Sequence, residues 1–124
     1  MEYKANILLV DDDEMILKMS SQLLKKAGFR VQTASNTIGA GYLLKDFDPD
    51  LVVLDINLPG SFSGDHACDA FRALKPDLKI VFFSGIEAAE LDQLGRNNKA
   101  DACVNKGGRM SELIETIKGL LHIS

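Results

Sequence analysis

Acidic, hydroxyl and amino side chains follow directly after separate apolar runs in this sequence. Asp11 and Asp12 follow the first run, Asp55 and Ser84 follow two others, and Lys106 follows a weaker run near the C-terminus. Uninterrupted apolar runs of this length, bounded by turn residues, are typical of strands buried on both faces. In an open parallel sheet, ligands bind beyond the carboxyl ends of the strands. We therefore expect these side chains to gather at one edge of a sheet.

The chemistry that suits this set of residues is phosphoryl transfer. Carboxylates on adjacent strands repel one another unless a cation neutralises them, and a hard divalent cation such as Mg²⁺ (or Mn²⁺) accepts oxygen ligands. Lys106 adds a compact positive charge, and Ser84 adds a hydroxyl donor. Positioning and charge neutralisation are what a transferring phosphoryl group requires. Asp55 would then be a nucleophile that forms an aspartyl phosphate.

Each of these residues taken alone has a more ordinary explanation. An aspartate after a strand is usually a turn residue or a helix cap, and a Ser-Gly pair is usually a turn. A lysine before glycine is usually a solvated residue near a chain reversal. Only the combination, on four strands in the expected order, favours a phosphoryl site.

Strand and helix patterns alternate along the whole chain. The expected strands are Ile7–Val10, Val31–Ala34, Leu51–Leu54, Ile80–Phe83 and Ala102–Asn105. The expected helices run from Glu14 to a stop at Gly28, from a cap at Asn36 to about Phe47, from the loop ending at Gly64 to before Pro76, from Ala88 to about Asn98, and through Leu113–Leu121. This alternation predicts an α/β fold with a parallel sheet.

The composition of the strands predicts their order in the sheet. The three strongly apolar strands should be central, and the two mixed ones, Val31–Ala34 and Ala102–Asn105, should be edges. A flavodoxin-like, doubly wound (βα)5 fold with strand order 2-1-3-4-5 satisfies this requirement.

Length and composition predict one domain covering residues 1–124. The formal net charge of −4 gives no support for nucleic-acid binding by the bulk surface, and no apolar stretch is long enough to predict a membrane span or a signal peptide. Cys68 and Cys103 are too few for a disulfide scaffold. We interpret them as reduced thiols of a cytoplasmic protein.

Over nearly its whole length the chain resembles the receiver domain of bacterial two-component response regulators, a CheY-like family. Four motifs carry the resemblance: Leu8–Asp13, Leu54–Gly60, Phe83–Gly85 and Asn105–Lys106. As a set they are highly specific.

The resemblance implies a role for each site residue. Asp55 would accept a phosphoryl group from a sensor histidine kinase or a phosphotransfer protein. Asp12 would bind Mg²⁺ directly, Asp11 mainly through water, and Asn57 through its backbone carbonyl. Ser84 would bond a phosphoryl oxygen and move inward on activation, and Lys106 would pair with the phosphate. Such a domain would at most catalyse its own phosphorylation and dephosphorylation, and would switch the binding of a downstream protein partner.

The chain departs from the family pattern in three places. Gly107 stands where the family usually has a proline in a cis peptide, so we predict a trans peptide and a more mobile loop. Cys103 stands three positions before the lysine, where many members have an aromatic switch residue. The loop around Phe62 looks one residue longer than usual.

Three further positions leave their roles open. Asn57 and Ile86 occupy the variable positions that tune phosphoryl lifetime in the family, and the sequence does not decide their net effect. Met15 and Met19 flank the first helix, where the resemblance places kinase docking; peripheral core packing is an equal alternative.

Other functions remain as alternatives. A flavin-binding protein shares the fold, but the aspartates after the first strand would repel a flavin phosphate. An aspartyl-phosphate phosphatase normally has its nucleophile after the first strand. A degenerate receiver that binds partners without phosphorylation is the strongest rival. We expect a stand-alone receiver or phosphorelay intermediate, or a receiver excised from a longer regulator.

Overall fold

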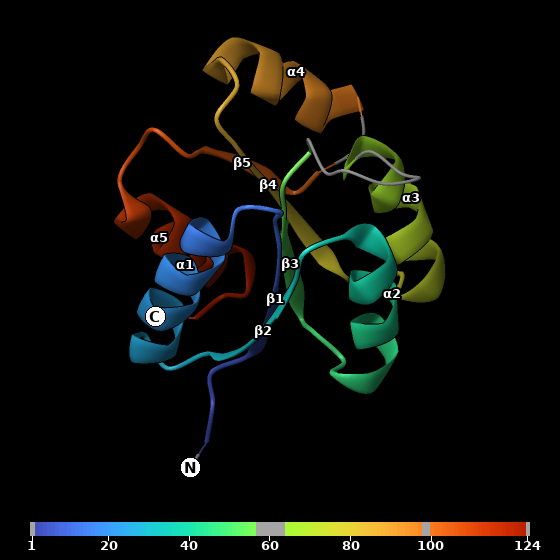
Figure 1. Cartoon of the computed structure of the whole chain (residues 1–124), viewed down its shortest axis with the longest axis vertical. Helices are drawn as coiled ribbons and strands as arrows, with labels where there is room; N and C mark the ends of the chain where they lie inside the picture. The colour runs from blue at the N-terminus through green and yellow to red at the C-terminus, as the bar shows by residue number, and fades with distance from the viewer. Residues whose placement is uncertain (1, 57–63, 98–99, 124) are drawn as a thin grey trace.

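The computed structural model describes residues 2–56, 64–97 and 100–123 (Figure 1). Its strands and helices alternate strictly along the chain. The elements are β1 (Asn6–Val10), α1 (Glu14–Lys26), β2 (Arg30–Ala34), α2 (Thr37–Asp46), β3 (Leu51–Leu54), α3 (Gly64–Leu74), β4 (Lys79–Ser84), α4 (Ala88–Asn97), β5 (Ala102–Asn105) and α5 (Met110–Leu120).

The five strands form one parallel sheet in the order β2-β1-β3-β4-β5. Val10 at the end of β1 is opposite Leu54 at the end of β3, and Ser84 at the end of β4 is opposite Asn105 at the end of β5. The predicted strand order is confirmed, and β2 and β5 are the edges. β4 extends two residues beyond Phe82, the residue opposite Leu54. Because the strands are parallel, the residues that follow them still lie at the same edge of the sheet.

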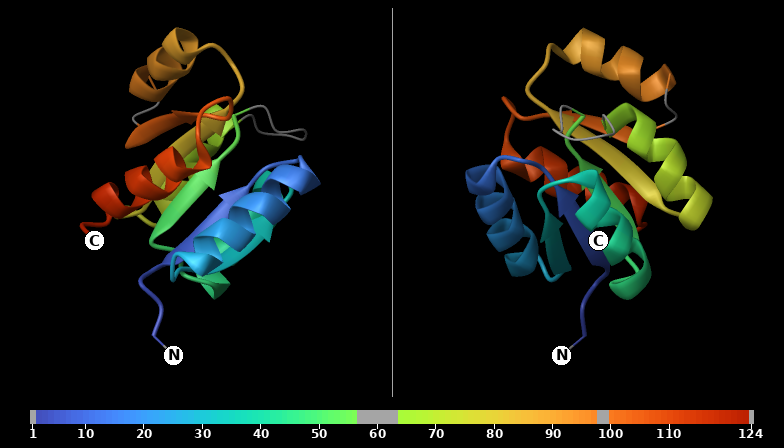
Figure 2. Two further views of the ribbon diagram at one scale, coloured as in Figure 1. Left: turned by 90° about the vertical axis from the view of Figure 1, so that its left-hand side faces the viewer. Right: turned by 45° about the vertical axis from the view of Figure 1, so that its right-hand side comes forward.

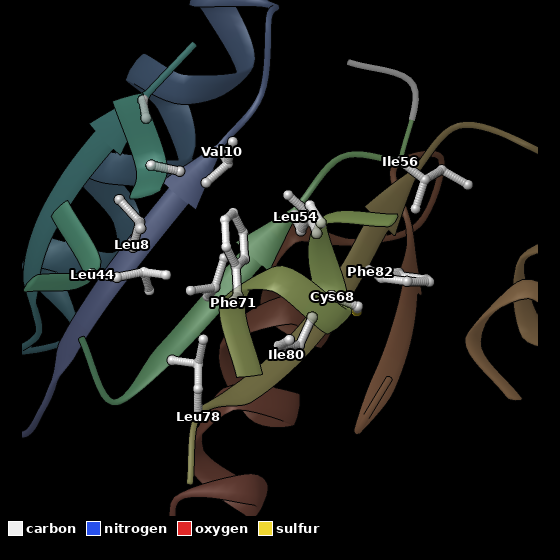
Figure 3. Packing of buried hydrophobic residues seen from close by; sticks show 14 of the residues in the cluster. Leu8, Val10, Leu44, Leu54, Ile56, Cys68, Phe71, Leu78, Ile80 and Phe82 are labelled. Atoms are coloured by element: carbon white, nitrogen blue, oxygen red, sulfur yellow. The ribbon is translucent and has the colours of Figure 1, made fainter. Parts of the chain in front are cut away.

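Helices cover both faces of the sheet (Figure 2). On one face, α1 and α5 pack over a core that includes Leu24, Phe29, Leu113 and Ile117. On the other face, α2, α3 and α4 pack over a second core. Figure 3 shows Phe71 of α3 in this second core. Two apolar faces explain why the three central strands are apolar throughout rather than alternating.

The helix boundaries follow local signals in the sequence. Asn36 caps α2 by accepting a hydrogen bond from the Gly39 N–H at 2.7 Å. Gly28 follows α1 with a φ of 101°, a conformation that disfavours residues with a Cβ atom. These two predictions are confirmed. The expected helix end at Asn98 lies outside the described residues, and the observed end is Asn97.

Candidate functional site

The residues that follow the strands are held by hydrogen bonds that extend the sheet. The Asp55 N–H donates to the Val10 carbonyl at 2.9 Å, and the Asp11 N–H donates to a carbonyl at the end of β2 at 3.1 Å. The Lys106 N–H donates to the Ser84 carbonyl at 2.8 Å. The backbone at this edge is therefore fixed one residue beyond β1, β3 and β5, and these side chains start from rigid positions.

Three of the predicted carboxylates form a cluster at this edge. Asp11, Asp12 and Asp55 each offer a carboxylate oxygen, and the three oxygens lie within 4.8 Å of one another. Asp11 and Asp55 are buried, with 3% and 5% of their surface exposed, whereas Asp12 is exposed. Two buried acids and one exposed acid thus form an oxygen-rich cluster that solvent reaches through Asp12.

Lys106 provides the positive charge at this cluster. Its Nζ lies 2.6 Å from Asp11 Oδ2 and 3.3 Å from Asp55 Oδ2, and it also lies 5.8 Å from the centre of the Phe83 ring. The lysine thus contacts both buried carboxylates and offsets part of their combined negative charge.

The charges at the site shift the pKa values of two groups. Burial raises the pKa of Asp11, and the nearby Asp55 adds to that rise, while Lys106 and the Asp13 N–H oppose it. Burial would lower the pKa of Lys106, but its carboxylate partners outweigh burial and raise it above the ordinary 10.5. Lys106 is therefore a permanent cation at neutral pH.

Ser84 is buried at the end of β4, and its carbonyl accepts the hydrogen bond from the Lys106 N–H. Its Oγ accepts a hydrogen bond from the Ile86 N–H at 3.3 Å. The hydroxyl is therefore engaged with its own loop in this structure.

The structure brings Asp11, Asp12, Asp55 and Lys106 together and places Ser84 on the adjoining strand end. Asn57, the predicted backbone ligand, lies outside the described residues, as does the longer loop around Phe62.

Asp13, the third residue of the acidic run, has a different task. Its side chain accepts hydrogen bonds from the Met15 and Ile16 N–H groups at 3.0 and 3.2 Å, as an N-cap of α1 does. Its own N–H donates to Asp11 Oδ1 at 3.0 Å. The start of α1 is thereby connected to the carboxylate cluster. The sequence signal was available, because an aspartate before a helical pattern is a common cap.

The structure shows the surroundings of residues that depart from the family pattern or whose roles the sequence leaves open. The described residues contain no cis peptide bond, so the predicted trans link between Lys106 and Gly107 is confirmed. Cys103 lies against α4, and its Sγ is 3.5 Å from the Leu91 carbonyl oxygen. Met15 and Met19 are 77% and 47% exposed, so the core-packing alternative for them is wrong.

Comparison with known proteins shows which proteins this chain is similar to. The model of the response regulator receiver domain matches residues 7–118. A Bacillus subtilis protein named uncharacterized transcriptional regulatory protein YvcP is 34% identical over 94% of this chain and 48% of its own length. Transcriptional regulatory protein PrrA of Mycobacterium leprae is 31% identical over 94% of this chain and 49% of its own length.

Solved structures agree with these matches. A CheY-like response regulator receiver domain protein from Methanospirillum hungatei JF-1 has a TM-score of 0.86 and 29% identity, with 98% of this chain and 95% of that chain covered. The chain therefore belongs to the response regulator receiver domain family of two-component systems. It spans about half the length of the curated relatives it matches.

Proposed function

We propose that Asp55 is the residue that accepts the phosphoryl group. The observation that carries this proposal is the position of its carboxylate: buried, at a central strand end, 3.3 Å from Lys106 Nζ and within the cluster formed with Asp11 and Asp12. A carboxylate here can attack phosphorus while the neighbouring groups neutralise charge.

The same cluster fits a divalent cation, which we propose to be Mg²⁺. Carboxylate oxygens from Asp11, Asp12 and Asp55 are hard donors of the kind that Mg²⁺ prefers, and Mg²⁺ usually keeps water and phosphoryl oxygens among its ligands. The Asn57 carbonyl is the further ligand implied by the family. When bound, the cation would supply charge neutralisation for the phosphoryl oxygens.

The transfer itself is a substitution at phosphorus. The proposed donor carries the phosphoryl group on a histidine imidazole. A carboxylate oxygen of Asp55 forms a new P–O bond as the P–N bond to that imidazole breaks. The imidazole leaves with the bonding electron pair and takes up a proton. Lys106 is placed to exchange part of its contact with Asp55 for the incoming phosphoryl oxygens, and Ser84 would rotate from the Ile86 N–H to donate to one of them.

The proposed phosphoryl donor is a sensor histidine kinase or a phosphotransfer protein. The exposed Met15 and Met19 lie on α1 beside the site, where adaptable apolar side chains suit a docking partner.

We place the protein in the cytoplasm, with a downstream protein partner and no direct nucleic-acid contact through this domain. In the described part of the chain, no helix has the length and apolarity needed to cross a bilayer.

The output of the whole protein is a separate proposal. Relatives of about twice this length are named transcriptional regulatory proteins. If this chain is part of a comparable protein, its phosphorylation would control a DNA-binding segment; if it acts by itself, it would control a docked partner.

Intact mass measurement tests the acceptor directly. The protein is incubated with acetyl phosphate, with Mg²⁺ or with a chelator, as wild type and as Asp55→Asn. We expect one added phosphoryl group in the wild type with Mg²⁺ and none in the other samples. A wild type that neither gains the group nor binds beryllofluoride would leave only the phosphorylation-independent interaction module.

A further inference from the structure

The loop that carries Lys106 is held by the side chain of the residue before it. Asn105 Oδ1 accepts a hydrogen bond from the Gly107 N–H at 2.7 Å. Asn105 Nδ2 donates to the Ile86 carbonyl at 2.7 Å. The amide therefore bridges the turn after β5 and the loop after β4. Lys106 lies between Asn105 and Gly107, the two residues of the turn that this bridge joins.

The anchor at Ile86 is itself part of the site. The Ile86 N–H donates to Ser84 Oγ, and the Lys106 N–H donates to the Ser84 carbonyl. Two hydrogen bonds thus connect the turn that carries Lys106 to the segment Ser84–Ile86. One is the backbone bond from the Lys106 N–H, and the other is the side-chain bond from Asn105. Two connections fix the direction of the turn better than one.

Gly107 is matched to this arrangement. A proline at this position would have no N–H to donate to Asn105 Oδ1. A Cβ atom at position 107 would lie 2.9 Å from the same oxygen, which is too close without a shift of the asparagine. The bridge thus requires a residue with an N–H group, and glycine is the residue that fits it without displacement.

We infer that Asn105 is a positioning residue: its side chain, with the Gly107 N–H, holds Lys106 against Asp55 and so takes the place of a rigid proline turn. The inference rests on the proposed phosphoryl transfer to Asp55. Lys106 Nζ is held 2.6 Å from Asp11 and 3.3 Å from Asp55 by a side chain of several rotatable bonds. Fixing its backbone reduces the positions that the ammonium group can sample.

The test measures the rate of phosphorylation by acetyl phosphate at saturating Mg²⁺, followed by intact mass. Asn105→Ala should slow the reaction about tenfold, which corresponds to the loss of one to two hydrogen bonds that orient the lysine. Gly107→Pro should slow it similarly. Asn105→Ser should recover part of the rate, because a serine hydroxyl can also accept from the N–H two residues on.

A double-substitution cycle separates positioning from general destabilisation. In a Lys106→Ala background, Asn105→Ala should cause no further loss of rate, because the bridge acts through the lysine. Gly108→Ala is the matched control: a Cβ atom there would meet the flexible end of Glu112 at 2.9 Å and lie in ordinary contact with the Asn105 carbonyl oxygen at 3.4 Å. The rate should stay within about twofold of wild type. The Mg²⁺ dissociation constant should also change less than about twofold in Asn105→Ala, because its side chain contributes no metal ligand.

The possible outcomes are distinct. An unchanged rate in Asn105→Ala, or an equal further loss in the Lys106→Ala background, would overturn the inference. If Asn105→Ala does not fold, the same cycle is run with Gly107→Pro, which removes the N–H that donates to Asn105 Oδ1, and the same two results decide. A wild type that takes up no phosphoryl group would instead contradict the proposed function itself.

Discussion

At the scale of single residues, the central electrostatic problem is two buried carboxylates side by side. Lys106 contacts both of them, while its own side chain remains 19% exposed. Without the lysine, Asp11 and Asp55 would face each other in a poorly solvated place, which is costly. Lys106 is thus a structural counterion before any phosphoryl group arrives.

Lys106→Ala should therefore lower the free energy of unfolding by about 1–3 kcal/mol in Mg²⁺-free buffer. Because the folded-state pKa of Lys106 is raised above 10.5, the ion pair contributes fully below that value and is lost as the pH rises through the raised pKa. The difference between wild type and variant should be constant near neutral pH and shrink only under strongly alkaline conditions. Urea unfolding at several pH values measures it, and a variant as stable as wild type at neutral pH would contradict this account.

Asp13 gives a contrasting prediction within the same acidic run. Asp13→Ala should cost about 1 kcal/mol of stability, because two N–H groups of the first turn of α1 lose their acceptor. Asp13→Ser should restore most of that stability. The Mg²⁺ affinity should be unchanged in both, and a loss of Mg²⁺ binding in Asp13→Ala would show that the cap is also a ligand.

The residue types of the site could be predicted, but their exact contacts could not. Asp11, Asp12, Asp55 and Lys106 follow apolar strands, so their meeting follows from the fold alone. The bridge made by Asn105 depends on the path of two loops, and no periodic pattern in the sequence specifies such a path. An asparagine two residues before a glycine was a signal for a local turn, but not for the bond to Ile86.

At the scale of secondary structure, the strands were the easiest elements to predict. β1, β3 and β4 are apolar along their whole length because each is covered on both faces, and this composition alone identified them as central. β2 and β5 lie at the edges, as their mixed composition indicated.

The close packing of α4 on β5 was not predicted. It depends on Gly95 of α4 and Cys103 of β5, which meet only in the folded chain. A Cβ atom at position 95 would overlap Cys103 Sγ. The cysteine at the usual position of the aromatic switch is thus packed beneath a glycine of α4.

Gly95→Ala should destabilise the protein by about 1–3 kcal/mol, because the new methyl group forces α4 away from β5. Gly41→Ala in α2 is the matched control, since a Cβ atom there meets nothing within 4 Å; it should stabilise the protein by up to about 1 kcal/mol. The double variant Gly95→Ala, Cys103→Ala should recover part of the lost stability, because the sulfur that the new methyl group meets is gone. Urea unfolding measures the stability of each variant. Equal stabilisation by both alanines would argue against the close approach.

The environment of Cys103 also predicts its reactivity. Burial and the nearby Asp92 raise the pKa of this thiol above its ordinary 9.0, with Arg96 opposing them. The thiolate is the reactive form, so Cys103 should react with iodoacetamide more slowly than free cysteine at mildly alkaline pH. Mass spectrometry of a Cys68→Ser variant measures this rate, and a rate equal to that of free cysteine would contradict the packing.

At the scale of the whole molecule, binding of Mg²⁺ and stability should be linked. A cation that binds only the folded chain stabilises it by about 2.7 kcal/mol at a hundredfold excess over its dissociation constant. Thermal unfolding should therefore shift upward with Mg²⁺ and return with a chelator. Asp12→Asn should reduce the shift, and an equal shift in this variant would place the cation elsewhere.

The most direct test of the account is to locate the phosphorylated residue chemically. Borohydride reduces an aspartyl phosphate to homoserine, which peptide mass spectrometry can assign to one position. After treatment with acetyl phosphate and Mg²⁺, we expect homoserine at position 55 and at no other aspartate. Homoserine at position 11 or 12, or at another acidic residue with Asp55 unmodified, would contradict the central role of Asp55.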